Sequence, residues 1–209
     1  MKSCYIFGSL PVKQMPKIPS DSFIIAADGG VKTLEKSGIK PDVIMGDFDS
    51  LGFVPTADNV IKLSVRKDDT DVGYALKYAM DKGFKNFFVY GAVGGLLDHT
   101  VANMQLCAAV SKKRCTAVFY GDDCNFTAVT GSGVSFSNAK GRISVFAVCG
   151  AAAGVTIKGL EYTLENAVLL PDMPLGVSNA FVSGETASVS VRTGTLLVVW
   201  QTAAEIKFN

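Results

Sequence analysis

Aspartates concentrated in four short segments are the feature of this chain most suited to chemistry. Of the 19 acidic residues 14 are Asp, and half of these lie in AADGG, GDFDS, KDDTD and GGLLDH, as Asp28, Asp47, Asp49, Asp68, Asp69, Asp71 and Asp98. Carboxylates gathered in one place repel each other unless a cation neutralises them. Mg²⁺ prefers such oxygen ligands and keeps coordination positions free for water and substrate phosphates. The composition therefore predicts an acidic site that requires Mg²⁺.

The segment GDFDS separates two aspartates by a single residue. If the preceding VIM is the end of a strand, Asp47 and Asp49 point to the same side and Phe48 points to the other. Two carboxylates would then face one cleft. The alternative is an Asp-rich turn with no ligand.

The segment KDDTD precedes an amphipathic stretch at 70–83. Either Thr70 or Asp69 is expected to be the N-cap of a helix, with Asp71 in its first turn. Helix capping does not explain the adjacent Lys67 and Asp68. The segment is therefore consistent both with a functional site and with a helix cap that has no further role.

The segment AADGG lies between an apolar run and a helical pattern. Asp28, Gly29 and Gly30 would stand where backbone N–H groups and the positive end of a helix can hold an anion. A turn that needs glycine for a positive φ is the alternative reading.

A second glycine-rich turn, GAVGGLLDH, contains Gly94 and Gly95. These glycines are weak evidence alone, because no Lys-Ser or Lys-Thr follows and the Walker A pattern is absent. His99, the single histidine, is interpreted as a capping or structurally hydrogen-bonded side chain rather than a catalytic one.

Alternating strand and helix patterns would position these segments. Apolar runs at 3–9, 23–30, 43–50 and 87–95 each lead into Gly or Asp near their ends, and helical patterns at 31–38, 70–83 and 97–114 alternate with them. This order predicts a mostly parallel sheet covered by helices. Ligands bind such sheets beyond the carboxyl ends of the strands, so loops distant in sequence can meet there.

After residue 124 the pattern changes to short β-type runs separated by Gly, Pro, Asn and Asp. We therefore predict two domains: an α/β domain at 1–123 and an antiparallel β-sandwich at 124–209. The second domain is rich in apolar residues, which suggests an interface beyond its own core. Trp200 is interpreted as a core or interface residue.

Charge and cysteine content exclude several classes of protein. A formal net charge of +1 and a pI of about 7.6 provide no electrostatic footprint for nucleic acid or an anionic membrane. The five cysteines are odd in number and lack C-x-x-C spacing, which argues against a disulfide framework or a structural zinc site. Without a run of eighteen apolar residues, we expect a soluble cytoplasmic protein that does not enter a membrane.

The order AADGG, IMGDFDS, KDDTD, GAVGGLLDHTVAN and GVSN closely resembles the thiamine pyrophosphokinase family over nearly the whole chain. The resemblance implies an enzyme that transfers a pyrophosphoryl group from ATP to thiamine and releases AMP. It also implies an α/β domain joined to a β-sandwich and a homodimer whose active sites lie between domains and draw on both subunits.

Carried over to this sequence, the resemblance implies a role for each matching residue. It makes Asp47, Asp49 and Asp71 the magnesium and catalytic carboxylates. The residues that it implies for ATP are Asp28, Gly29, Gly30, Lys67, Asp68, Thr70, Gly94 and Gly95, and those for thiamine are Asp98, Ser178 and Asn179. The sequence departs from the family at Leu96, where an Arg usually follows the paired glycines. Either Lys67 or Arg66 compensates for the missing cation, or the nucleotide preference differs.

Two other functions remain open at this point. A phosphatase of the haloacid-dehalogenase type would use Asp47 of GDFDS as a phosphorylated nucleophile, but it leaves KDDTD, GGLLDH and the β-rich half without a role. A dimeric nucleotide- or thiamine-binding module that has lost its activity is supported only by Leu96.

Overall fold

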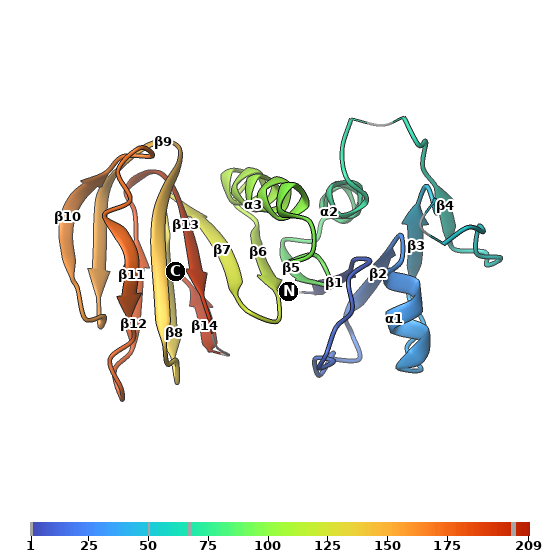
Figure 1. The fold of residues 1–209 in the computed structure, drawn as a ribbon, viewed down its shortest axis with the longest axis horizontal. Helices are drawn as coiled ribbons and strands as arrows, with labels where there is room; N and C mark the ends of the chain where they lie inside the picture. Colours follow the sequence, from blue (N-terminus) through green and yellow to red (C-terminus); the bar gives the residue numbers. More distant parts are fainter. Residues whose placement is uncertain (1, 50, 67, 202–203) are drawn as a thin grey trace. The chain divides into compact units, whose positions relative to one another are not determined.

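The computed structural model describes residues 2–49, 51–66, 68–201 and 204–209 and forms two compact units (Figure 1). The first unit comprises 1–103 and 119–122, and the second comprises 104–118 and 123–209. The architecture is a mixed α/β fold with three helices among the described residues. The predicted boundary at 123/124 stays a prediction.

Parallel strands build the first unit. They are β1 (Ser3–Phe7), β2 (Phe23–Ala27), β3 (Val43–Gly46), β4 (Val60–Lys62) and β5 (Asn86–Tyr90). They lie in the order β5-β1-β2-β3-β4, and each neighbouring pair is parallel. The chain moves outward from β1 to β4 and then returns to place β5 on the other side of β1. The strand order therefore reverses at β1, which is where open α/β sheets bind ligands.

Helices α1 (Gly30–Lys36) and α2 (Asp71–Asp81) pack on this sheet. Alternate residues of β1 point to opposite faces. Phe7 joins Val31 and Leu34 of α1 in one buried cluster. Helix α2 buries Val72, Gly73, Ala75, Leu76 and Ala79 along one stripe, as the 3.6-residue period of its sequence predicts.

Helix α3 (Leu97–Lys112) and strand β6 (Thr116–Tyr120) each contribute residues to both units. Lys112 lies in the last turn of α3, where a positive charge complements the helix dipole. Tyr120 at the end of β6 stacks on Tyr90, with ring centroids 4.7 Å apart.

Antiparallel strands build the second unit. They are β7 (Asn125–Thr130), β8 (Gly133–Ser137), β9 (Arg142–Lys158), β10 (Leu164–Leu169), β11 (Gly176–Ala180), β12 (Ala187–Ser190), β13 (Thr193–Trp200) and β14 (Glu205–Phe208). The long β9 pairs with β10, β11, β12 and β13, while β7 pairs with β13 and β8 pairs with β12 and β14. All of these pairs are antiparallel, in agreement with the short β-type runs of the sequence.

The core of the second unit contains Trp200, which is 1% exposed. Its ring meets the ring of Phe136 edge to face, with centroids 5.1 Å apart. Phe126 and Ile143 are also fully buried. Of the two places predicted for Trp200, the structure shows the core.

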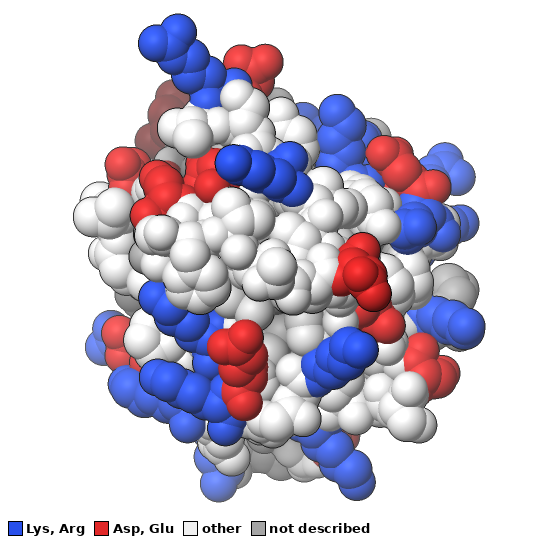
Figure 2. Space-filling view, turned by 90° about the vertical axis from the view of Figure 1, so that its right-hand side faces the viewer, with Lys and Arg blue, Asp and Glu red and all other residues white. Residues whose placement is uncertain are grey.

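Among the described residues, the acidic side chains and the cysteines form no group of three that could hold a metal ion outside the acidic segments that the sequence predicted. On the face seen in Figure 2, Lys and Arg are interspersed with Asp and Glu, and a group of acidic side chains lies at its upper left. All five cysteines are free. Burial, with a smaller effect from the charge of Asp42, raises the pKa of the Cys4 thiol to about 12, so this thiol is protonated at neutral pH. No helix within the described residues is long and apolar enough to span a membrane.

Candidate active site

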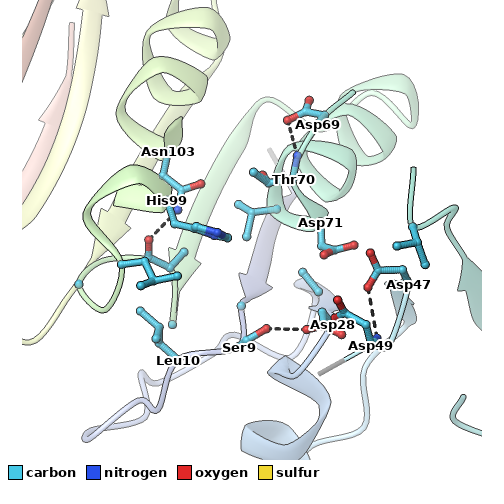
Figure 3. Close-up of a pocket in the computed structure, with 18 residues that line it drawn as sticks. Ser9, Leu10, Asp28, Asp47, Asp49, Asp69, Thr70, Asp71, His99 and Asn103 are labelled. Carbon is cyan, nitrogen blue, oxygen red and sulfur yellow. Dashed lines mark hydrogen bonds between the residues drawn. The ribbon is translucent and has the colours of Figure 1, made fainter. Parts of the chain in front are cut away.

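A pocket of about 540 Å³ opens at the carboxyl ends of the parallel strands (Figure 3). Its walls come from the residues after β1, β2, β3 and β5, from the segment that leads into α2 and its first turn, and from the first two turns of α3. The lining residues are Gly8, Ser9, Leu10, Ala27, Asp28, Asp47, Asp49, Val65, Asp69, Thr70, Asp71, Val72, Gly91, Ala92, Gly94, Leu96, His99 and Asn103. The pocket thus lies at the reversal of strand order, as an α/β sheet predicts.

Three carboxylates from two strand ends meet in this pocket. Asp28 follows β2, and Asp47 and Asp49 follow β3. One oxygen of each carboxylate lies within 4.8 Å of an oxygen of the other two. This spacing and the all-oxygen donor set fit a hard divalent cation such as Mg²⁺. The sequence predicted that the loops carrying these aspartates meet at the strand ends. The family resemblance grouped Asp47 and Asp49 with Asp71 as metal ligands and assigned Asp28 to ATP.

The backbone explains why these carboxylates converge. Phe48 adopts a φ of +62° and is 2% exposed, packed in the cluster beneath α1, so Asp47 and Asp49 are left on the pocket side. The predicted opposition of Phe48 to the two aspartates is confirmed. The Asp49 amide donates to Asp47 Oδ1 at 3.3 Å, which ties the two residues together.

Asp28 is held more tightly than its neighbours. It is 6% exposed, with a φ of +47°, and its amide donates to the carbonyl oxygen of Met45 at 2.7 Å. Ser9 Oγ donates to Asp28 Oδ2 at 3.0 Å and accepts from the Gly29 amide at 3.1 Å. Gly46 is required here because a Cβ on it would lie 2.9 Å from the Asp28 Cα. Ser9 therefore orients Asp28, and its only sequence signal is a hydroxyl directly after a strand.

Helix α2 brings KDDTD to the same pocket. Thr70 is the N-cap, since its Oγ1 accepts from the Gly73 amide at 3.0 Å. Of the two predicted caps, Asp69 instead accepts from the Thr70 amide at 2.7 Å. Asp71 lines the pocket, and Figure 3 shows its carboxylate beside that of Asp47. Lys67 lies outside the described residues, and Asp68 is not among the lining residues.

The glycines of AADGG shape the backbone rather than line the pocket. Gly29 is the N-cap of α1 and Gly30 is its first residue. A Cβ on Gly30 would lie 1.9 Å from the Phe7 carbonyl oxygen, so the helix can approach β1 only through glycine. Their predicted contact with ATP stays a prediction.

The loop after β5 is held by side chains of α3. Thr100 Oγ1 accepts from the Gly94 amide at 3.2 Å, and Asn103 Nδ2 donates to the Ala92 carbonyl oxygen at 2.6 Å. Gly94 and Gly95 have φ values of +95° and +64°, which favour glycine. Gly94 lines the pocket and Gly95 does not.

Leu96 lines the pocket with 66% of its surface exposed. Neither Lys nor Arg is present among the described lining residues. Arg66 is not among these lining residues, and Lys67 lies outside the part of the chain that the structure describes, so compensation by either residue stays a prediction.

The three residues predicted for thiamine lie outside this pocket's lining. Asp98 is exposed in the first turn of α3, where its Oδ1 accepts from the His99 amide at 2.8 Å. Ser178 and Asn179 belong to β11 in the second unit. Ser178 is exposed with a φ of +58°, while Asn179 is 4% exposed and binds both the amide and the carbonyl of Tyr162. Asn179 thus has a structural task, and the thiamine role of all three stays a prediction.

These features define a two-unit α/β and β protein with a carboxylate pocket suited to a divalent cation and a phosphorylated ligand. The sequence matches two family models, described as the thiamin pyrophosphokinase catalytic domain over residues 17–119 and the thiamin pyrophosphokinase vitamin B1 binding domain over residues 134–196. The chain belongs to the thiamin pyrophosphokinase family.

Known proteins agree with this assignment. A thiamine pyrophosphokinase from Bacillus subtilis is 30% identical over 116 residues, a match that spans 51% of this chain and 54% of that protein. A crystal structure of thiamine pyrophosphokinase from the same species superposes with a TM-score of 0.82 at 23% identity, covering 97% of this chain and 100% of the other. The thiamin pyrophosphokinase structure from Candida albicans superposes with a TM-score of 0.71 at 16% identity, covering 96% of this chain and 89% of the other. At these identities the structural likeness establishes the fold.

Proposed function

We propose that this protein is a thiamine pyrophosphokinase. It transfers the pyrophosphoryl group of ATP to the hydroxyethyl oxygen of thiamine, and the products are thiamine diphosphate and AMP. The observation that carries this proposal is the meeting of Asp28, Asp47 and Asp49 within 4.8 Å in the pocket of a chain that belongs to this family. The phosphatase and binding-module readings receive no support from the family match.

The proposed cation is Mg²⁺, held by Asp28, Asp47 and Asp49 with Asp71 nearby. When bound, it supplies positive charge to the phosphate oxygens and a fixed geometry for the transfer. In the proposed reaction the thiamine hydroxyl oxygen attacks the β-phosphorus, a new oxygen–phosphorus bond forms, and the bond from the β-phosphorus to the oxygen of AMP breaks. Asp71 or Asp49 accepts the hydroxyl proton, and AMP leaves with the electron pair of the broken bond.

The proposed division of labour follows the two predicted domains. The mostly parallel α/β domain at 1–123 binds ATP and the cation. Of the residues implied for ATP, Asp28, Thr70 and Gly94 line the pocket. The antiparallel β-sandwich at 124–209 contributes to thiamine binding, which is supported by the description of the family model that matches residues 134–196. The acidic pocket binds ATP only as its magnesium complex, because the carboxylates repel the free triphosphate.

A coupled assay for AMP tests the function directly. Purified protein with ATP and Mg²⁺ should release AMP only when thiamine is present, and removal of divalent cations with a chelator should abolish the release until Mg²⁺ is restored. Free phosphate in place of AMP would instead identify a hydrolase. Saturable ligand binding without either product would identify a binding module.

We propose further that the protein is a homodimer with active sites shared between subunits. The stretch of 16 residues from just before β10 into β11 carries several exposed apolar side chains, at Tyr162, Val168, Leu170, Met173, Leu175 and Val177. Both strands pair with β9, β10 along residues 152–157 and β11 along residues 142–145. An apolar surface of this kind usually marks a contact with another protein.

Light scattering combined with size exclusion checks the dimer. Leu175→Glu places a charge within this apolar surface and should convert a dimer into monomers with little thiamine-dependent AMP formation. Phe53→Glu is the matched control, because Phe53 is equally exposed, at 61% against 58% for Leu175, but belongs to the first unit. A wild-type monomer with full activity would contradict shared active sites.

A further inference from the structure

Asn103 is a buried polar side chain in the wall of the pocket. It is 5% exposed, and its Nδ2 donates to the Ala92 carbonyl oxygen at 2.6 Å. A carbonyl oxygen can only accept, so this bond fixes the orientation of the amide: Nδ2 faces Ala92, and Oδ1 faces the other way. Oδ1 is buried and has no hydrogen-bond donor among the described residues. Buried acceptors are rarely left without a donor, which indicates that a ligand supplies one.

The two ends of the pocket differ in chemistry. Figure 3 shows the carboxylates of Asp28, Asp47, Asp49 and Asp71 gathered on one side, with Asn103 and His99 of α3 on the other. Asn103 contacts Ala92, and the lining also includes the apolar residues Leu10 and Leu96. A ligand that fills this space needs a phosphate end for the cation and a flat, largely apolar end that carries an N–H donor. A nucleoside triphosphate has this form.

We propose that Asn103 determines the nucleotide specificity of the pocket, by accepting a hydrogen bond from the exocyclic amino group of adenine at Oδ1. The inference rests on the proposed function, because ATP is the proposed donor. It also gives a reason for adenine rather than hypoxanthine or guanine: these bases carry a carbonyl oxygen at the same ring position, and two acceptors would then face each other.

His99 is a second polar side chain of α3 that lines the pocket. It lies one helical turn before Asn103 on the same side of α3, and Figure 3 shows its imidazole next to Asn103. The side chain of His99 is exposed, so its ring can turn aside as the base enters. The sequence signal for this pair is the spacing of four residues between two polar side chains at the start of a helix that follows a glycine-rich loop.

The test compares the Kd values of ATP and inosine triphosphate, both with Mg²⁺ and without thiamine, by calorimetry. Inosine triphosphate has the same sugar and phosphates and replaces only the amino group by a carbonyl. The wild type should prefer ATP by about tenfold. Asn103→Leu, which is similar in size, lacks both the acceptor and the donor that binds the Ala92 carbonyl oxygen. It should weaken the binding of ATP about tenfold more than that of inosine triphosphate, so that the preference for ATP is lost. Asn103→Ala provides the same comparison if the Leu variant does not fold.

Ser111→Ala is the matched control, since Ser111 is a buried polar residue on the same helix whose Oγ bonds to Thr130. It should leave the preference for ATP unchanged. If Asn103→Leu raised the Kd values of both nucleotides by the same factor, Asn103 would have a purely structural role and the proposal would be overturned. A second outcome would also overturn the proposal. If Asn103→Leu left the nucleotide preference unaltered but changed the preference between thiamine and its analogue with a carbonyl in place of the pyrimidine amino group, Asn103 would recognise thiamine instead.

Failure of the proposed function has a different signature. A protein that prefers ATP over inosine triphosphate through Asn103, but forms no AMP with thiamine, would retain the nucleotide inference and lose the transfer reaction. A protein that forms thiamine diphosphate equally well from both nucleotides would retain the reaction and overturn the role of Asn103.

Discussion

Asp47→Asn should lower thiamine-dependent AMP formation by about a thousandfold, the largest effect that we expect from a single substitution. Asp47 belongs to the group of three carboxylates whose oxygens lie within 4.8 Å of each other. Asparagine keeps the shape and can still accept the bond from the Asp49 amide, but it removes one of the negative charges that would hold the cation. The loss should therefore appear in kcat and in the Mg²⁺ concentration needed for half-maximal rate.

Stability measurements separate this effect from unfolding. Without a cation the three carboxylates repel each other, so Asp47→Asn should leave the melting temperature of the metal-free protein unchanged or slightly higher. Asp58→Asn is the control, because Asp58 is exposed and is not a lining residue of the pocket. It should keep wild-type turnover. Near-normal turnover of Asp47→Asn would remove Asp47 from the site.

Measuring the AMP-forming rate as a function of Mg²⁺ concentration also separates two roles for Asp71. This residue lines the pocket but does not belong to the group of three. If Asp71 accepts the hydroxyl proton, Asp71→Asn should lose turnover and keep its apparent affinity for Mg²⁺. If Asp71 is a ligand, both should fall together.

Trp200→Ala should destabilise the second unit by about 3–5 kcal/mol, the cost of a large cavity in a packed core. Trp200 is 1% exposed, and its ring packs against the ring of Phe136 with centroids 5.1 Å apart. In β13 it also pairs with Asn125 of β7 and Ile143 of β9. The cavity would therefore open where three strands meet.

Urea unfolding followed by circular dichroism measures this change, because the variant has no tryptophan for fluorescence. Trp200→Phe is the informative comparison. The indole N–H is buried without an acceptor in the part of the chain that the structure describes, so phenylalanine loses ring volume but no hydrogen bond. Trp200→Phe should lower the free energy of unfolding by about 1 kcal/mol. Equal stability of Trp200→Ala and the wild type would show that Trp200 is not part of a packed core.

Local patterns were sufficient for much of the fold. The apolar stripe of α2, its cap at KDDTD and the opposition of Phe48 to its two aspartates all depend on residues close together in sequence. The stripe of α2 follows from the helix period. Phe48 lies beyond the end of β3 with a φ of +62°, so its orientation was predicted correctly but comes from a left-handed backbone rather than from strand alternation. The choice of Thr70 over Asp69 as the cap required the structure, because both residue types cap helices.

Asp28 illustrates what local patterns could not provide. It is close to Asp47 and Asp49 because β2 and β3 are parallel neighbours, and its amide bonds to Met45 of β3. The sequence placed Asp28 at a strand end but contained no statement of which strands are adjacent. Ser9 and Asn103 were missed for the same reason, since their partners Asp28 and Ala92 lie 19 and 11 residues away.

By itself, the sequence determined which residue types carry the chemistry of this protein and that they stand at the ends of strands and the starts of helices. Hydrophobic periodicity and turn residues encode those positions, because they act over a few residues. Only the tertiary structure decided which of them meet. The order β5-β1-β2-β3-β4 brings Asp28 to Asp47 and Asp49, and the packing of α3 on the loop after β5 points Asn103 at the same pocket. Strand order is a property of long-range pairing, which no short segment of sequence contains.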